Sequence, residues 1–99
     1  MQEVLRGLEP ERVFWWFDRI AQIPHGSGRE QVLSDYIKEY FQKLGFLVTQ
    51  DRHWNLVIRK PATEGYEQAP AVILEAHLDM VCEKEADSGH DFDRDPIRI

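Results

Sequence analysis

Residues 71–81 read Ala-Val-Ile-Leu-Glu-Ala-His-Leu-Asp-Met-Val, and this stretch decides the fold. Its first four residues form an unbroken apolar run, which is typical of a strand that is covered on both faces. Such a strand belongs in the middle of a sheet and needs a neighbouring strand on each side. The whole chain has 99 residues, whereas domains commonly contain about 100 to 150 residues. We therefore expect the chain to be the opening segment of a larger α/β domain.

Two amphipathic helices are expected before this strand. Pro10 suits the first turn of a helix, and Pro24 stops that helix. Ser27 and Glu30 have the spacing of a capping box, which predicts the start of the second helix, and Gly45 is typical of a helix end. We interpret the apolar stripes as core-packing faces. They consist of Val13, Trp16, Phe17, Ile20 and Ala21 in the first helix, and of Leu33, Tyr36, Ile37, Tyr40, Phe41 and Leu44 in the second.

Short β-rich segments follow the second helix. Residues 46–49 and 56–58 are rich in strand-forming side chains, and the polar stretch 50–55 between them predicts a hairpin. Residues 60–70 contain Pro61, Gly65 and Pro70 and predict an exposed loop. The fold class is therefore α/β, with two helices followed by about three strands, and the last four residues are typical of the start of a further strand.

Composition narrows the class of function. Hydrophobic residues make up 42% of the chain, as in a globular core, and 18 acidic against 12 basic residues give a net charge of −6. This charge repels phosphate groups and argues against nucleic acid and membrane surfaces as partners. No apolar run approaches the roughly 18 residues of a membrane span. The single cysteine, Cys82, cannot form an internal disulfide, which favours a reducing, cytosolic location.

The negative charge is concentrated near the end of the chain. Eight of the 18 acidic residues lie between positions 75 and 95, where only Lys84 and Arg94 oppose them. Such a run is either a solvated loop or a cation site. Asp91, Asp93 and Asp95 alternate as in a calcium loop, but Pro96 stands where that loop requires glycine. We interpret the segment as a solvated loop and keep an acidic cation-binding protein as an alternative.

His77 and Asp79 are the candidate functional residues. They follow the apolar strand, and ligands of open α/β sheets bind beyond the carboxyl ends of strands. Residues two apart in an extended chain point to the same side, so the imidazole and the carboxylate can face one site. Imidazole is a good zinc ligand and a carboxylate can orient it, although a hydrogen-bonded structural histidine is the other interpretation. We interpret the remaining chemical groups as surface or loop histidines and an inert thiol: His25, His53, His90 and Cys82.

Several separated motifs carry a resemblance to a known family. They are residues 71–81, Ile23-Pro24-His25-Gly26-Ser27 with Glu30, residues 59–63 with Gly65, and residues 90–92 with 95–97. In this order they resemble the N-terminal segment of the aminoacyl-histidine dipeptidases, also called Xaa-His dipeptidases or peptidase D, which are cocatalytic zinc metallopeptidases. The resemblance covers essentially the whole chain. One departure is Trp54, where many relatives have glycine, and it puts the geometry of the hairpin turn in doubt.

The resemblance implies a cytoplasmic hydrolase that cleaves dipeptides of the Xaa-His type with two divalent ions, usually zinc, with cobalt or manganese as alternatives. His77 matches a metal ligand, and Asp79 matches the aspartate that supports this ligand and is counted as catalytic. The remaining ligands and the general base would lie beyond Ile99. The chain alone is therefore expected to be inactive, because one histidine and one supporting carboxylate cannot hold two ions.

The resemblance also implies a domain organisation and partners. Residues 1–99 would be an N-terminal fragment of the catalytic domain, without the lid or dimerisation domain. The expected partners are a short peptide substrate, the remainder of the catalytic domain and, for the full-length protein, a second copy. A non-catalytic module that pairs through an exposed sheet edge is a further alternative.

Overall fold

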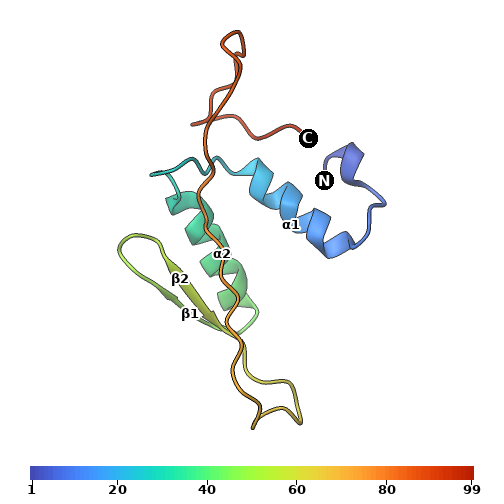
Figure 1. Ribbon diagram of the computed structural model, residues 1–99, viewed down its shortest axis with the longest axis vertical. Helices are drawn as coiled ribbons and strands as arrows, with labels where there is room; N and C mark the ends of the chain where they lie inside the picture. The colour runs from blue at the N-terminus through green and yellow to red at the C-terminus, as the bar shows by residue number, and fades with distance from the viewer. The chain divides into compact units, whose positions relative to one another are not determined.

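A computed structural model describes residues 1–99, and its elements follow the chain in a simple order (Figure 1). They are a 3₁₀ turn η1 at Glu3–Leu5, helices α1 at Glu11–Gln22 and α2 at Gln31–Lys43, and strands β1 at Leu47–Gln50 and β2 at Leu56–Arg59. The chain divides into one unit of residues 1–33 and 79–99 and a second unit of residues 34–78. Neither helix is long and apolar enough to cross a membrane.

Helix α1 forms where the sequence predicts it. The carbonyl of Pro10 accepts from the backbone N–H of Val13 at 3.0 Å, and the helix ends where the N–H of Ile23 bonds the carbonyl of Ile20 at 3.1 Å. Only part of the predicted apolar face is covered, since Ala21 is buried whereas Val13 and Phe17 are exposed. The first unit has a small core because its fully buried apolar side chains are few: Leu5, Ala21 and Leu33.

The two ends of the chain meet in the first unit through the side chain of Gln2. Its Nε2 donates to the carbonyl of Ile97 at 3.3 Å, and its Oε1 accepts from the N–H of Ile99 at 3.0 Å. The N–H of Ile97 donates to the carbonyl of Ala21 in α1 at 2.8 Å. Residues 96–99, predicted as the start of a strand, therefore join no sheet and are held by a glutamine and the end of a helix.

Asp18 holds the start of the chain to α1. This carboxylate is buried, and its Oδ1 accepts from the backbone N–H of Gln2 at 3.0 Å. That hydrogen bond, aided by the positive charge of the N-terminus, holds the pKa of Asp18 below its ordinary value of 3.8 although desolvation opposes the shift. A carboxylate with a lowered pKa in the folded state stabilises the fold above its unfolded pKa, and this contribution is lost as the pH falls through the folded pKa.

We expect Asp18→Ala to lower the free energy of unfolding at neutral pH by roughly 1–3 kcal/mol, because it leaves the N–H of Gln2 without its acceptor. The difference from the unmutated chain should shrink as the pH falls below 3.8 and through the lower pKa that Asp18 has in the folded state. Urea unfolding followed by tryptophan fluorescence measures both. Exposed Asp87 is the matched control, and an equal effect of Asp87→Ala, or an Asp18 effect that does not depend on pH, would contradict this account.

The two ends of α2 behave differently from each other. At the C-terminus, the N–H of Gly45 bonds the carbonyl of Gln42 at 2.9 Å and the N–H of Phe46 bonds that of Phe41 at 3.1 Å. Gly45 has φ 87°, and the Phe41 and Phe46 rings stack with their centroids 5.8 Å apart. These are the contacts of a Schellman motif, so the predicted helix end is confirmed.

At the N-terminus of α2 the predicted capping box is wrong. Glu30 does reach back along the chain, but its Oε1 accepts from the N–H of Gly28 at 2.7 Å. The helix begins at Gln31, so Ser27 lies outside its first turn and is not the N-cap. The hydroxyl of Ser27 donates to the carboxylate of Asp79, 52 positions away in the chain.

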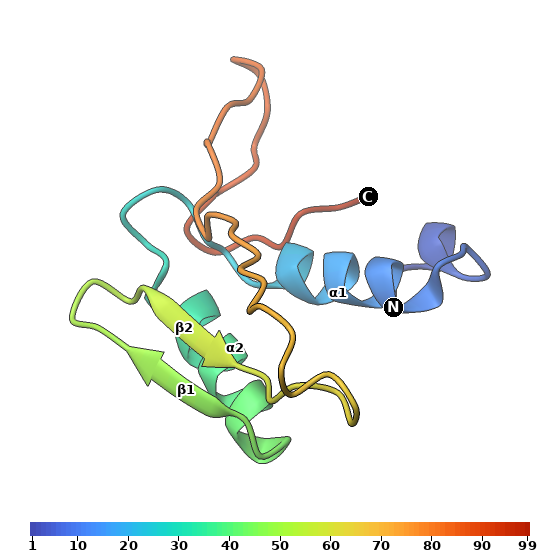
Figure 2. The same cartoon turned by 60° about the horizontal axis from the view of Figure 1, so that its bottom comes forward.

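The second unit contains the predicted hairpin, whose antiparallel strands are seen in Figure 2. Val48 pairs with Ile58 and Thr49 with Val57. In the turn, the Asp51 carboxylate accepts from the N–H of His53 and from both the N–H and the side chain of Asn55, at 2.8–2.9 Å. The bond from the Asn55 side chain is the main cause of the lowered pKa of Asp51.

Trp54 occupies the one strained position of this turn, with φ 65°. Its carbonyl accepts from the hydroxyl of Ser34, a fully buried residue of α2, at 2.7 Å. Glycine adopts the left-handed region without strain, which is the physical reason to expect glycine at this position. The Asp51 bonds and the Ser34 bond hold the turn with tryptophan in place.

We expect Trp54→Gly to be more stable than Trp54→Val by roughly 1–2 kcal/mol, since both remove the indole but only valine keeps a Cβ in the left-handed region. Urea unfolding followed by far-UV circular dichroism gives the two free energies of unfolding. Equal stability of the two variants would show that the backbone at this position is not left-handed in solution.

The apolar run at residues 71–74 differs from its prediction as a paired strand. The sheet contains only β1 and β2, and Val72, Ile73 and Leu74 are 83%, 89% and 93% exposed. The hairpin strands pair with each other, so the run has no strand beside it. The preceding loop is exposed throughout residues 60–70, as predicted.

Candidate metal site and its supporting loop

The two predicted site residues are two positions apart in the chain. His77 is exposed and belongs to the second unit, and Asp79 is half-buried and belongs to the first. Imidazole and carboxylate are the donor types that zinc uses, and zinc sites contain about three or four protein ligands. Nowhere in the chain do three or more His, Cys, Asp or Glu side chains gather into a group that could hold a metal ion. The donors therefore fit a metal in kind, but their number does not make a complete site.

A loop between the helices holds Asp79 within the first unit. Gly26 and Met80 form a parallel β-bridge. The N–H of Met80 donates to the carbonyl of His25 at 2.9 Å, and the N–H of Ser27 donates to the carbonyl of Met80 at 3.2 Å. The hydroxyl of Ser27 then donates to Oδ2 of Asp79 at 2.5 Å. Residues 25–27, which we call the Asp79 loop, thus fix both the backbone and the carboxylate at this position.

His25 forms part of this loop and is buried at 8% exposure. It lies in the loop between the helices, as predicted, but it is buried and not at the surface. The ring atom Nδ1 lies 2.6 Å from the carbonyl of Ile23. A carbonyl only accepts, so Nδ1 is the donor in this hydrogen bond.

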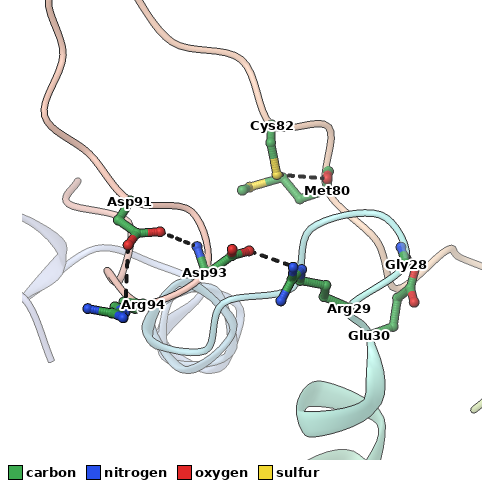
Figure 3. A network of polar contacts seen from close by, with 8 residues as sticks. All are labelled: Gly28, Arg29, Glu30, Met80, Cys82, Asp91, Asp93 and Arg94. Atoms are coloured by element: carbon green, nitrogen blue, oxygen red, sulfur yellow. Dashed lines mark hydrogen bonds and ion pairs between the residues drawn. The ribbon is translucent and has the colours of Figure 1, made fainter.

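Gly26 lies close to the segment that contains Met80 and Cys82. A Cβ at this position would lie 2.7 Å from the Sγ atom of Cys82. Cys82 itself is exposed, and its thiol lies 3.7 Å from the carbonyl of Met80 (Figure 3). The thiol packs beside the loop, and its interpretation as an inert group stays a prediction.

The aspartates of the acidic segment make internal contacts (Figure 3). Asp91 accepts from the N–H of Asp93 at 2.9 Å and pairs with Arg94 at 3.7 Å, and Asp95 accepts from the N–H of Asp91 at 2.8 Å. Asp93 pairs with Arg29 at 3.1 Å. These contacts are those of a folded surface loop, and they use the carboxylates that a calcium loop would need.

The other two histidines lie in loops, as predicted. His53 is exposed in the hairpin turn. His90 is half-buried, with its ring edge-on to Phe92 at 4.7 Å between centroids, and its Nε2 is buried without a hydrogen-bond partner. Lys84 donates to the carbonyl of His90 at 2.6 Å, so the contact of this residue with the acidic segment is through its backbone.

Comparison with known proteins shows that the chain is similar to part of two dipeptidases. The chain is 45% identical over 94 residues to the cytosol non-specific dipeptidase of Escherichia coli (strain K12), covering 95% of this chain and 19% of the relative. It resembles one segment of a dipeptidase. The solved structure of aminoacylhistidine dipeptidase from Vibrio alginolyticus matches with a TM-score of 0.91 and 42% identity, covering 95% of this chain and 19% of that one.

These matches confirm the resemblance and the α/β fold class predicted from the sequence. The chain spans about one fifth of the length of either relative. No protein-family model matches it. The roles of His77 and Asp79 and the identity of the metal stay predictions.

Ser27 is the contact residue that sequence reasoning missed. Its spacing from Glu30 is fully explained by a helix cap, so the sequence gives no reason to look for another role. The one signal in the sequence is that residues 23–27 and 71–81 both carry the resemblance, which is compatible with a contact between them.

Proposed function

We propose that the chain is part of the catalytic domain of a cytoplasmic, metal-dependent dipeptidase that uses a pair of divalent ions, with zinc as the first choice. The similarity across 95% of the chain to two proteins named as dipeptidases carries this proposal. The dipeptide class is the Xaa-His type, after the relative named aminoacylhistidine dipeptidase. In this proposal the rest of the catalytic domain and a short peptide are the partners, and the complete enzyme is a homodimer.

His77 is the proposed metal ligand, and Asp79 is the proposed carboxylate that orients it. A carboxylate in contact with a ligating histidine fixes the tautomer and the direction of the ring and makes the ligand more basic. Asp79 suits this task because the Asp79 loop restrains its carboxylate and its backbone. When bound, a metal pair supplies an activated water and polarises the scissile carbonyl.

A chimera tests the proposed function. In it, this chain replaces the matching segment of the E. coli relative, which is 45% identical over 94 residues. We expect the purified chimera to retain zinc and to hydrolyse a dipeptide with a C-terminal histidine. The chain alone should do neither, since it lacks a group of three metal donors.

Two results would count against the proposal. A folded chimera without zinc and without hydrolysis would show that this chain does not supply its part of the site. Zinc retention and dipeptide hydrolysis by the chain alone would show that the site lies within it and was assigned to the wrong residues.

A further inference from the structure

We propose that Ser27 is a positioning residue of the candidate site, which acts by holding the Asp79 carboxylate through its hydroxyl. This inference rests on the proposed function, because Asp79 has a role in catalysis only there. The hydroxyl donates to Oδ2 of Asp79 at 2.5 Å. This distance is that of a charge-assisted O–H···O⁻ bond, which is shorter and stronger than a neutral hydrogen bond.

The backbone fixes the geometry of this contact on both sides. The N–H of Ser27 bonds the carbonyl of Met80 at 3.2 Å, and the N–H of Met80 bonds the carbonyl of His25 at 2.9 Å. These two bonds keep Ser27 in register with Asp79 before any side chain contributes. The hydroxyl of Ser27 is therefore already close to Oδ2 of Asp79, so forming the hydrogen bond between them costs little additional side-chain entropy.

The sequence around Ser27 leaves the hydroxyl available for this task. Its neighbours Gly26 and Gly28 have no side chains, so Ser27 provides the side-chain donor of that turn. The expected alternative task, capping α2, is not performed, because Glu30 serves the N–H of Gly28 and the helix begins at Gln31.

Restraint of a carboxylate matters when the carboxylate orients a metal ligand. The hydrogen bond from Ser27 holds Oδ2 of Asp79 and restricts rotation of the carboxylate. An orienting carboxylate that can rotate loses part of its effect on the ligand, and partners of this outer kind typically contribute 10–100-fold in metal affinity or activity. Ser27 contacts the orienting carboxylate and not the metal ligand itself, so we expect its loss to lower metal affinity or activity by the lower end of that range, about tenfold.

The first experiment tests the contact in the chain itself. The side-chain carboxyl carbon of Asp79 is followed by NMR in the unmutated chain, in Ser27→Ala and in Ser27→Thr. The resonance should shift in Ser27→Ala and return toward its original position in Ser27→Thr, which restores a hydroxyl. No shift in Ser27→Ala would show that the bond is absent in solution and would overturn the inference.

The second experiment tests the role in the chimera, with Ser88→Ala as the matched serine control outside the Asp79 loop. Ser27→Ala should lower kcat and zinc affinity, measured by chelator competition, by about tenfold. KM, the melting temperature and the circular dichroism spectrum should stay unchanged. Ser27→Thr and Ser88→Ala should match the unmutated chimera.

The outcomes separate this inference from the proposed function. An active chimera in which Ser27→Ala keeps its kcat and zinc affinity overturns the inference alone. The same holds if Ser27→Thr is as impaired as Ser27→Ala, or if activity falls only in proportion to the folded fraction, because the role would then be structural. An unmutated chimera that neither retains zinc nor hydrolyses dipeptides overturns the proposed function, and the inference with it.

Discussion

Replacement of His77 by alanine in the chimera should remove zinc and reduce kcat by more than the roughly 100-fold that loss of an outer partner costs. The reason is that an imidazole bonded to the ion cannot be replaced by a methyl group, and a site that loses a ligand no longer lowers the pKa of its bound water. Zinc content by mass spectrometry and initial rates of dipeptide hydrolysis give the two numbers. His77 is exposed in this chain, so alanine there should leave folding unchanged.

His53→Ala is the matched control for this variant. His53 is also exposed, but it lies in the turn of the hairpin, where Asp51 accepts from its backbone N–H rather than from its ring. It should retain zinc and activity fully. Loss of zinc in both variants would point to a general effect on the fold, and full activity of His77→Ala would remove His77 from the site.

Asp79→Ala should be the second most damaging change, with a loss of roughly 10–100-fold in zinc affinity and kcat. The carboxylate is proposed to orient the ligand rather than to bind the ion alone, so its removal weakens the site without emptying it. Asp79→Asn keeps the shape but loses the charge, and should fall between the unmutated chimera and Asp79→Ala. Chelator competition and pre-steady-state rates measure the two effects.

The controls for Asp79 also test the acidic cation-binding alternative. Asp87→Ala changes an exposed carboxylate of the same segment and should have no effect. The triple replacement of Asp91, Asp93 and Asp95 by alanine should preserve zinc, since these carboxylates serve turns and ion pairs of a surface loop. Loss of metal in the triple variant but not in His77→Ala would favour the cation-binding protein instead.

Local patterns predicted the regular elements well because the interactions that form them are close in sequence. Pro10 and Pro24 bracket α1, and Gly45 ends α2 with both bonds of a Schellman motif. The hairpin lies where two strand-forming segments flank a polar stretch. Strand β1 begins and ends one residue later than expected, and β2 ends one residue later. Each of these signals lies within a few residues of the structure that it specifies.

The misses share one physical cause, which is a partner that is distant in sequence. Ser27 has the spacing of a cap, yet α2 begins only at Gln31, and the Ser27 hydroxyl donates to Asp79, 52 residues later. His25 lies in the predicted loop but is buried, and its backbone carbonyl accepts from the N–H of Met80, 55 residues later. The run at 71–74 is apolar enough for a central strand, but a strand is defined by its neighbours, and β1 and β2 pair with each other.

The candidate site was predicted in part. The sequence places His77 and Asp79 after an apolar run, and the resemblance implies their roles. The comparisons support the resemblance and leave these roles as predictions. The sequence does not show which residues hold Asp79, because the Asp79 loop lies between two helices far earlier in the chain.

The most direct test of the central claim is an anomalous diffraction map of the zinc-loaded chimera, recorded at the zinc absorption edge. We expect a zinc peak about 2.0–2.1 Å from a ring nitrogen of His77, with the Asp79 carboxylate hydrogen-bonded to the hydroxyl of Ser27. A zinc peak whose ligands exclude His77, in a chimera that hydrolyses dipeptides, would contradict it.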